Sequence, residues 1–316
     1  MIYSCIMENS CNQQKHVVGV DLGGTKVEAC LLDTERNLIA RERIPSEADR
    51  GHDRVVRNII DVIEKTAGKK SYDAVGIGTP GTYIEADDCL YGAPHTPTYE
   101  KPGLIALLRE RLRVPLIVEN DANCLALAEF FASCAGRYRH VMAVILGTGF
   151  GSGLILDNRL YRGANGGAGE IGHMSIDING RLCECGRRGC VEAYLSGPSI
   201  GRRFAELGGE TLNPGEIFKL YQSQDSRARQ LFEESCRILA EMFADAVNVF
   251  DLEAVILGGG VSNLPIWYEK CPPIMEKSLF GVPGRKIPLL KTRLGDSAGV
   301  FGAAYLALRH FGFMDF

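Results

Sequence analysis

Short apolar runs that end in glycine alternate along this chain with segments of helical periodicity. A first run, at residues 16–21, is followed by a tight Leu-Gly-Gly-Thr turn and a second apolar run at 26–33. Two such runs around a glycine turn predict a β-hairpin. The same arrangement returns at residues 141–146 and 152–156, around the sequence Gly-Thr-Gly-Phe-Gly. The repeated hairpin predicts a duplicated α/β architecture.

Most of the chain between these strands has apolar residues at helical spacing. Apolar residues three and four positions apart predict helices at about 52–67, 104–112, 226–250 and 297–310, and further strands are expected at 74–78, 116–118 and 254–257. Asp121 follows a strand and begins a helix that we expect to run to about residue 133, so we interpret Asp121 as its N-cap. The Asn120–Asp121 segment is therefore expected where a strand ends and a helix begins.

Length and charge narrow the class of protein. A chain of 316 residues suits two lobes with a cleft, because single cores rarely grow beyond about 250–300 residues. Lys and Arg number 35 against 39 for Asp and Glu, a balance that disfavours nucleic acid and anionic membranes as partners. Residues 1–15 lack periodicity, and we expect a disordered extension there. Since no apolar run reaches the roughly 18 residues of a membrane span and no secretory signal is present, we expect a cytoplasmic protein with a small-molecule partner.

Three glycine-rich turns follow apolar strands, at residues 21–26, 147–151 and 258–260. Glycine lets backbone amides approach phosphate oxygens closely, because no Cβ stands in the way. The chain has no G-x-x-x-x-G-K-[ST] sequence, and no turn has the context of a dinucleotide fold. The strand–turn–strand use of glycine is instead typical of phosphate binding in actin-like ATPase folds.

A cluster of cysteines indicates a metal site. Cys183, Cys185 and Cys190 lie close together, with His173 ten residues before the first of them. Three thiolates and one imidazole make a full tetrahedral set for structural Zn²⁺. Free thiols or a disulfide are the alternatives, and a reducing cytosol favours the metal over the disulfide.

Six motifs occur in one order along the chain: Asp21–Glu28, Asn120–Cys124, Leu146–Gly153, Gly169–His173, Cys183–Cys190 and Ile256–Ser262. Together they resemble the ROK family (repressor, open reading frame, kinase) of bacterial sugar kinases and repressors. The resemblance runs from about residue 16 to 309 and includes Gly295–Ala304. It implies a two-lobed actin-like ATPase (ribonuclease H-like) fold. Residues 16–121 plus about 298–316 would form a small α/β lobe, and residues 122–297 a large α/β lobe that carries the zinc loop.

The resemblance also implies roles for individual residues. Asp121 would be the general base that takes the proton from a sugar hydroxyl, and Asp21 would orient Mg²⁺ through water. Residues implied to bind ATP and Mg²⁺ are Asp21, Gly23, Gly24, Thr25, Lys26, Thr148, Gly149, Gly259 and Gly260. Residues implied to bind the sugar are Pro80, Gly81, Asn120, Asp121, Glu170, His173 and Glu192. His173 would serve both zinc and sugar, with one ring nitrogen for each.

The implied activity is ATP-dependent phosphorylation of the 6-hydroxyl of a hexose. We rank a plain hexose (fructose, glucose or mannose) slightly above the alternative, N-acetylglucosamine. A sugar-responsive transcriptional regulator of the same family is a less favoured alternative, because only 15 residues precede the first strand. Many relatives carry Asn on the loop after the Pro-Gly turn, where this chain has Pro94 and His95. The family also implies a homodimer or a higher homo-oligomer.

Overall fold

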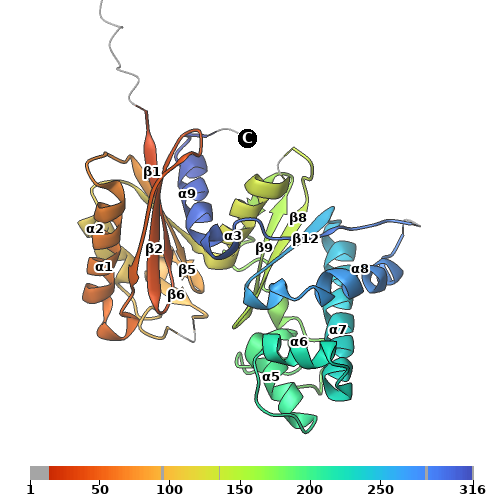
Figure 1. The fold of residues 1–316 in the computed structure, drawn as a ribbon. Helices are drawn as coiled ribbons and strands as arrows, with labels where there is room; N and C mark the ends of the chain where they lie inside the picture. Colours follow the sequence, from red (N-terminus) through yellow and green to blue (C-terminus); the bar gives the residue numbers. More distant parts are fainter. Residues whose placement is uncertain (1–13, 94–95, 135, 282–283, 315–316) are drawn as a thin grey trace, which may run out of the picture.

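Two five-stranded sheets with the same strand order organise the chain (Figure 1). The computed structural model describes residues 14–93, 96–134, 136–281 and 284–314. The first sheet has the order β3 (Leu38–Pro45), β2 (Lys26–Asp33), β1 (His16–Leu22), β4 (Ala74–Thr79), β7 (Leu116–Asn120). The second has the order β10 (Arg159–Tyr161), β9 (Phe150–Leu156), β8 (Val141–Leu146), β11 (Ala254–Gly258), β12 (Leu289–Lys291). In both sheets an antiparallel hairpin continues into parallel strands, which confirms the predicted duplication.

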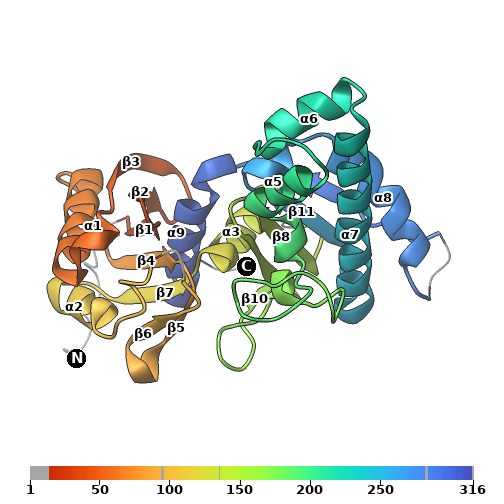
Figure 2. The ribbon, with the colours of Figure 1, turned by 90° about the horizontal axis from the view of Figure 1, so that it is seen from below.

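Helices cover both faces of each sheet (Figures 1 and 2). In the first lobe, α1 (His52–Ala67) and α2 (Leu104–Arg111) lie on the face opposite α9 (Ala298–His310). In the second lobe, α3 (Asp121–Glu129) packs on one face. The remaining helices of that lobe are α4 (Glu192–Leu195), α5 (Gly197–Glu206), α6 (Pro214–Gln222), α7 (Ser226–Phe250) and α8 (Ile266–Ser278). Smaller elements are the hairpin β5 (Thr82–Ile84) and β6 (Cys89–Tyr91), and single turns at Ala48–Arg50, Glu85–Asp87, Phe130–Cys134, Ile171–His173, Gly260–Asn263 and Gly295–Ser297.

Helices α3 and α9 lie between the two sheets and pack against each other (Figure 2). Their buried apolar side chains form one cluster that includes residues from both sheets. Glycine makes the close packing possible, because a Cβ at Gly302 of α9 would lie 1.8 Å from the carbonyl oxygen of Cys124 in α3. A Cβ at Gly76 would similarly lie 1.9 Å from the carbonyl oxygen of Ala303. The α3–α9 pair therefore joins the lobes through direct backbone contact.

Gly302→Ala is expected to destabilise the protein. The added methyl has no room against the Cys124 backbone, so the helices must separate, and overpacking of this kind costs about 1–3 kcal/mol of the unfolding free energy. Chemical denaturation measures the loss. Gly215→Ala in α6 is the matched control, because the new Cβ would meet only the end of the Asn213 side chain, at 3.2 Å. Equal stability of the two variants would contradict the packing argument.

The predicted strands and long helices are present, with several differences. Asn120, and not Asp121, is the N-cap of α3, because its side chain accepts hydrogen bonds from the amides of Ala122 and Asn123. The α-helix also ends at Glu129, where a π-helical turn takes over. Strand β3 was missed because its exposed edge carries a charged run, and α8 because it contains Pro272 and Pro273.

No helix among the described residues is long and apolar enough to cross a membrane. The residue limits predicted for the two lobes and for the N-terminal extension stay predictions, and residues 1–13 lie outside the described part.

Candidate functional site

The turn between β1 and β2 is held by hydrogen bonds that its carbonyl groups accept from Tyr99 and Ser46. Tyr99 donates its hydroxyl to the carbonyl of Gly23 at 3.0 Å, and Ser46 donates its hydroxyl to the carbonyl of Gly24 at 2.7 Å. The Ser46 amide donates to the carbonyl of Thr25 at 3.1 Å. No described residue accepts a hydrogen bond from the amides of Gly24 and Thr25. These amides are available for an anion, as a phosphate-binding turn requires.

The turn between β8 and β9 is built in the same way. The Gly147 amide donates to the carbonyl of Gly149 at 3.1 Å, and the Gly147 carbonyl accepts from the amide of Gly197 at 2.7 Å. Among the described residues, nothing accepts from the amides of Thr148 and Gly149. The two lobes thus each present a turn with available backbone donors.

The third glycine turn packs behind the second. Gly259 has a φ of 88°, and a Cβ there would lie 2.5 Å from the carbonyl oxygen of Leu146, so only glycine fits. A cavity of about 880 Å³ opens beside these two turns. Its lining comprises Gly147, Thr148, Gly197, Pro198, Gly201, Arg202, Thr211, Leu212, Asn213, Pro214, Gly215, Gly260, Val261 and Leu264. A cavity of this size, lined by apolar side chains and by Thr148 of the second turn, suits a nucleotide.

Asp21 stands just before the first turn and interacts electrostatically with Asp121. Burial, together with the negative charges of Asp121 and Glu28, raises the pKa of Asp21 to about 7, and Lys26 acts in the opposite direction. The N-terminal end of α9 leaves room for Asp21, since a Cβ at Gly299 would lie 2.9 Å from its carboxylate carbon. Like charges that interact favour a bound cation nearby, and the carboxylate of Asp21 is a ligand type that suits the expected Mg²⁺.

The segment that carries Asp121 is fixed by Asn120. The Asn120 side-chain oxygen accepts from the amides of Ala122 and Asn123, at 2.9 and 3.2 Å. Its amide nitrogen donates to the carbonyl of Gly81 at 3.2 Å, so Asn120 contacts the Pro-Gly turn. Asp121 Oδ1 accepts from the Ala122 amide at 2.8 Å, which leaves Oδ2 for a ligand.

The pKa of Asp121 is higher than that of an ordinary aspartate. Burial raises its pKa to about 6, and the negative charge of Glu170 contributes in the same direction. The pKa of Glu170 is raised as well, mainly because neighbouring protein groups displace water from it, with Glu192 adding to the shift and His173 opposing it. These four side chains interact electrostatically, so the structure brings together most of the residues predicted to bind the sugar.

Glu192 has contacts that the sequence did not indicate. Its Oε2 accepts from the amide of Phe150 at 2.9 Å and lies 3.1 Å from the position of a Cβ on Gly149. Its Oε1 lies 3.9 Å from Sγ of Cys183. Glu192 therefore joins the loop that carries Cys183, Cys185 and Cys190, here called the cysteine loop, to the second glycine turn.

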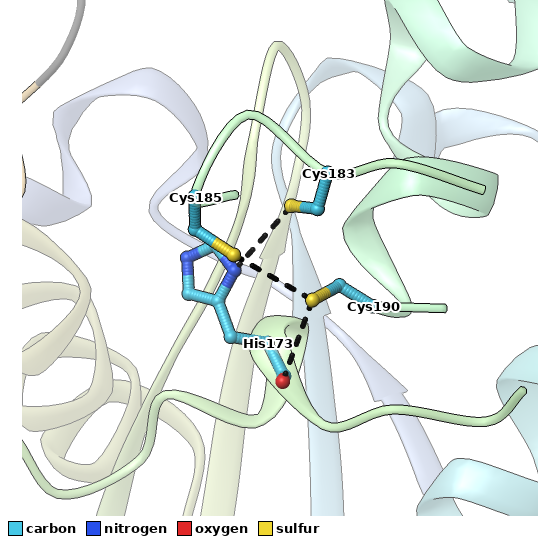
Figure 3. Close-up of side chains that lie close together, drawn as sticks. All are labelled: His173, Cys183, Cys185 and Cys190. Carbon is cyan, nitrogen blue, oxygen red and sulfur yellow. Dashed lines mark hydrogen bonds between the residues drawn. The ribbon is translucent and has the colours of Figure 1, made fainter. Parts of the chain in front are cut away.

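The three clustered cysteines and His173 converge as predicted (Figure 3). Their ligand atoms all lie within 4.8 Å of one another. Sγ of Cys185 and Sγ of Cys190 are 3.6 Å apart, and Sγ of Cys183 is 3.7 Å from Nδ1 of His173. Ligands about 2.3 Å from a tetrahedral zinc ion would lie roughly 3.8 Å apart, so the set fits this metal. Because Nδ1 faces the cysteines, Nε2 is the nitrogen left for another ligand.

Comparison with known proteins agrees with this geometry. The model of the ROK family matches residues 17–310. The chain belongs to the ROK family. Its fold is the two-lobed actin-like ATPase fold of solved ROK sugar kinases, as the motifs implied.

Similar ROK proteins include kinases of several sugars. The N-acetyl-D-glucosamine kinase of Vibrio parahaemolyticus is 33% identical over 303 residues, which cover 92% of this chain and 99% of that protein. The ROK hexokinase of Thermus thermophilus is 32% identical with a TM-score of 0.86, covering 94% of this chain and 99% of that one. A ROK glucokinase of Streptomyces griseus, solved with glucose and AMPPNP, is 30% identical with a TM-score of 0.76, covering 93% and 99%. The predicted enzyme class, an ATP-dependent sugar kinase, is confirmed.

Some residues of the candidate site were not predicted from sequence. Tyr99 and Ser46, which hold the first turn, lie 76 and 22 residues away from the glycines they contact, and no local pattern marks them. Among the described residues that line the large cavity, Arg202 is the charged one. Pro94 and His95, which replace the usual Asn region, lie outside the described residues.

Proposed function

We propose that this chain transfers the γ-phosphoryl group of ATP to the 6-hydroxyl of N-acetyl-D-glucosamine, with Asp121 as the general base. The observation that supports the chemistry is that Asp121 stands at the start of α3, on the segment fixed by Asn120, and interacts electrostatically with Asp21 and Glu170. A base with a pKa of about 6 is ionised at neutral pH and still basic enough to accept a proton from a hydroxyl as the phosphorus–oxygen bond forms.

The nucleotide would lie in the large cavity. Its phosphates would reach the free amides of Gly24 and Thr25 on one side and those of Thr148 and Gly149 on the other. Gly23, Lys26, Gly259 and Gly260 complete the proposed nucleotide site. Mg²⁺ near Asp21 would supply charge neutralisation for the phosphates. The Asp21 carboxylate would then be ionised, because a nearby cation lowers its pKa.

The sugar would lie where Asp121, Glu170 and His173 converge. Nε2 of His173 would contact a sugar hydroxyl, and the approach of Nδ1 to Sγ of Cys183 supports this because it leaves Nε2 free of the cysteines. Asn120, Glu192 and the Pro80–Gly81 turn complete the proposed sugar site. Zinc held by His173 and the three cysteines would fix this region, and a homo-oligomer stays a prediction.

The identity of the sugar rests on the relatives. The N-acetyl-D-glucosamine kinase of Vibrio parahaemolyticus matches nearly its whole length, which favours N-acetylglucosamine over the plain hexoses that we first ranked higher. A plain hexose kinase is the second candidate, favoured by the TM-score of 0.86 to the Thermus thermophilus hexokinase. These relatives do not favour the third alternative, a sugar-responsive transcriptional regulator.

Initial rates with Mg-ATP and N-acetylglucosamine, glucose, mannose or fructose test this proposal. We expect kcat/KM for N-acetylglucosamine to exceed the others by about 10-fold or more, the usual size of a discrimination that rests on one substituent. Asp121→Asn serves as the blank for contaminating kinases. Higher kcat/KM with a plain hexose would favour the second candidate, and no turnover with any sugar would refute a sugar kinase.

A further inference from the structure

Glu119 is a buried carboxylate directly beneath the proposed catalytic segment. Its side chain is 3% exposed at the end of β7. Its Oε1 accepts from the backbone amide of Asn120 at 2.9 Å and from the side-chain amide of Asn123 at 3.0 Å. Asn123 itself is 1% exposed in α3. Glu119 thus holds the backbone just before Asp121 and a side chain of α3 just after it.

The other oxygen of Glu119 meets a cation from the second sheet. Oε2 lies 2.7 Å from Nε of Arg162, which follows β10 and is half-exposed. Among the described residues, Arg162 is the basic side chain within ion-pair distance of Glu119. Since burial of an unpaired carboxylate is costly, the ion pair with Arg162 compensates the burial of Glu119.

Arg162 also begins the glycine-rich loop that carries Glu170. The Arg162 carbonyl accepts from the amide of Ala168 at 3.2 Å, which closes the loop on itself. Near its other end, the Gly169 carbonyl accepts from the hydroxyl of Ser152 in β9. The position of Arg162 therefore influences where Glu170 lies.

We propose that the Glu119–Arg162 ion pair is a positioning device that couples the Asn120–Asp121 segment to the 163–170 loop across the two sheets. The pair holds the base and the sugar-binding Glu170 at a fixed separation, and neither member touches the substrate. This inference rests on the proposed function, since it concerns the residues assigned there to the sugar. It predicts a selective effect on the sugar, because the nucleotide turns have their own separate supports.

Glu119→Gln tests the ion pair most directly, because it removes the charge of Glu119 and little else. Glutamine keeps an oxygen for the amides of Asn120 and Asn123 but places an uncharged amide opposite Arg162. We expect kcat/KM for the sugar to fall about 10–100-fold, the range in which a displacement of about 1 Å acts on catalysis. The KM for ATP is expected to change less than about twofold, and sugar affinity measured by calorimetry to fall.

Arg162→Gln, the double variant and Arg162→Lys complete the test. The losses of Glu119→Gln and Arg162→Gln are expected to be non-additive in the double variant, because both remove the same interaction. Arg162→Lys should recover part of the activity, because it retains the charge without the planar fork. Arg139→Gln is the matched control, since its ion pair with Asp157 is exposed on both sides, and it should behave as wild type.

The outcomes separate this inference from the proposed function. Variants with an unchanged KM for the sugar, or with equal losses for sugar and ATP together with a lower melting temperature, would overturn the positioning role. Additive losses in the double variant would also overturn it. A wild-type enzyme that phosphorylates no sugar would refute the proposed function instead.

Discussion

Asp121→Asn is expected to lower kcat by about 10²–10⁴-fold, the range that a positioned general base contributes. Asparagine has nearly the same shape and keeps the side-chain oxygen that accepts from the Ala122 amide at 2.8 Å, so the helix start should persist. What it loses is the ability to accept the hydroxyl proton. Sugar affinity, measured by calorimetry, should therefore change little while kcat falls.

The pH dependence follows from the same group. A base acts only when ionised, so kcat/KM should fall as the pH drops through about 6, the pKa of Asp121, and should level off above it. Because Asp21 interacts with Asp121, the observed midpoint belongs to the pair, and bound Mg²⁺ should shift it downward. In Asp121→Asn, the fall in kcat/KM at low pH should be absent. A variant that retains wild-type kcat, or a profile flat from pH 5 to 8, would contradict the role of Asp121 as the base.

Loss of the proposed zinc site is expected to have the second largest effect. Cys185→Ser, or treatment with a strong chelator, should remove about one zinc ion per chain, measured by elemental analysis. A structural site of this kind contributes folding free energy directly, so the melting temperature should fall. His173 is a predicted ligand and lies three residues from Glu170, so the KM for the sugar should rise about tenfold or more, the usual effect of disturbed support around a metal.

Loss of zinc is expected to have a smaller but measurable effect on the KM for ATP. Glu192 Oε2 accepts from the Phe150 amide in the second glycine turn, and its Oε1 lies 3.9 Å from Sγ of Cys183. Movement of the cysteine loop should therefore reach the turn through one side chain. Cys134→Ser is the control, because Cys134 is buried away from the cluster. Purified protein without zinc, or zinc loss that weakens ATP before the sugar, would refute this prediction.

The local chemistry of this protein could be predicted from sequence because it lies in short segments. The glycine turns at 23 and 147 need no distant partner to be recognised, since a turn between two strands is a local event. The spacing of Cys183, Cys185 and Cys190 likewise indicates a metal without knowledge of the fold. For the same reason the long helix at Ser226–Phe250, with its sustained apolar stripe, was located from periodicity alone.

Other features depend on groups that are far apart in the chain. The N-cap of α3 was assigned to Asp121, because the sequence does not show which of two adjacent polar residues turns back onto the helix. Glu119 and Arg162 are 43 positions apart by their numbers, and nothing in either neighbourhood indicates that they meet. Their contact exists only because two separate sheets are joined through α3 and α9.

The sequence by itself thus determined the family, the duplicated α/β fold and the residue types of the site, since backbone turns, periodicity and ligand spacing are local properties. Only the tertiary structure decided that Asp121 interacts with Asp21, how Glu192 links the cysteine loop to a glycine turn, and how Arg162 compensates a buried Glu119. The physical reason is that burial and charge pairing depend on which distant segments pack together, and that is settled by the whole fold.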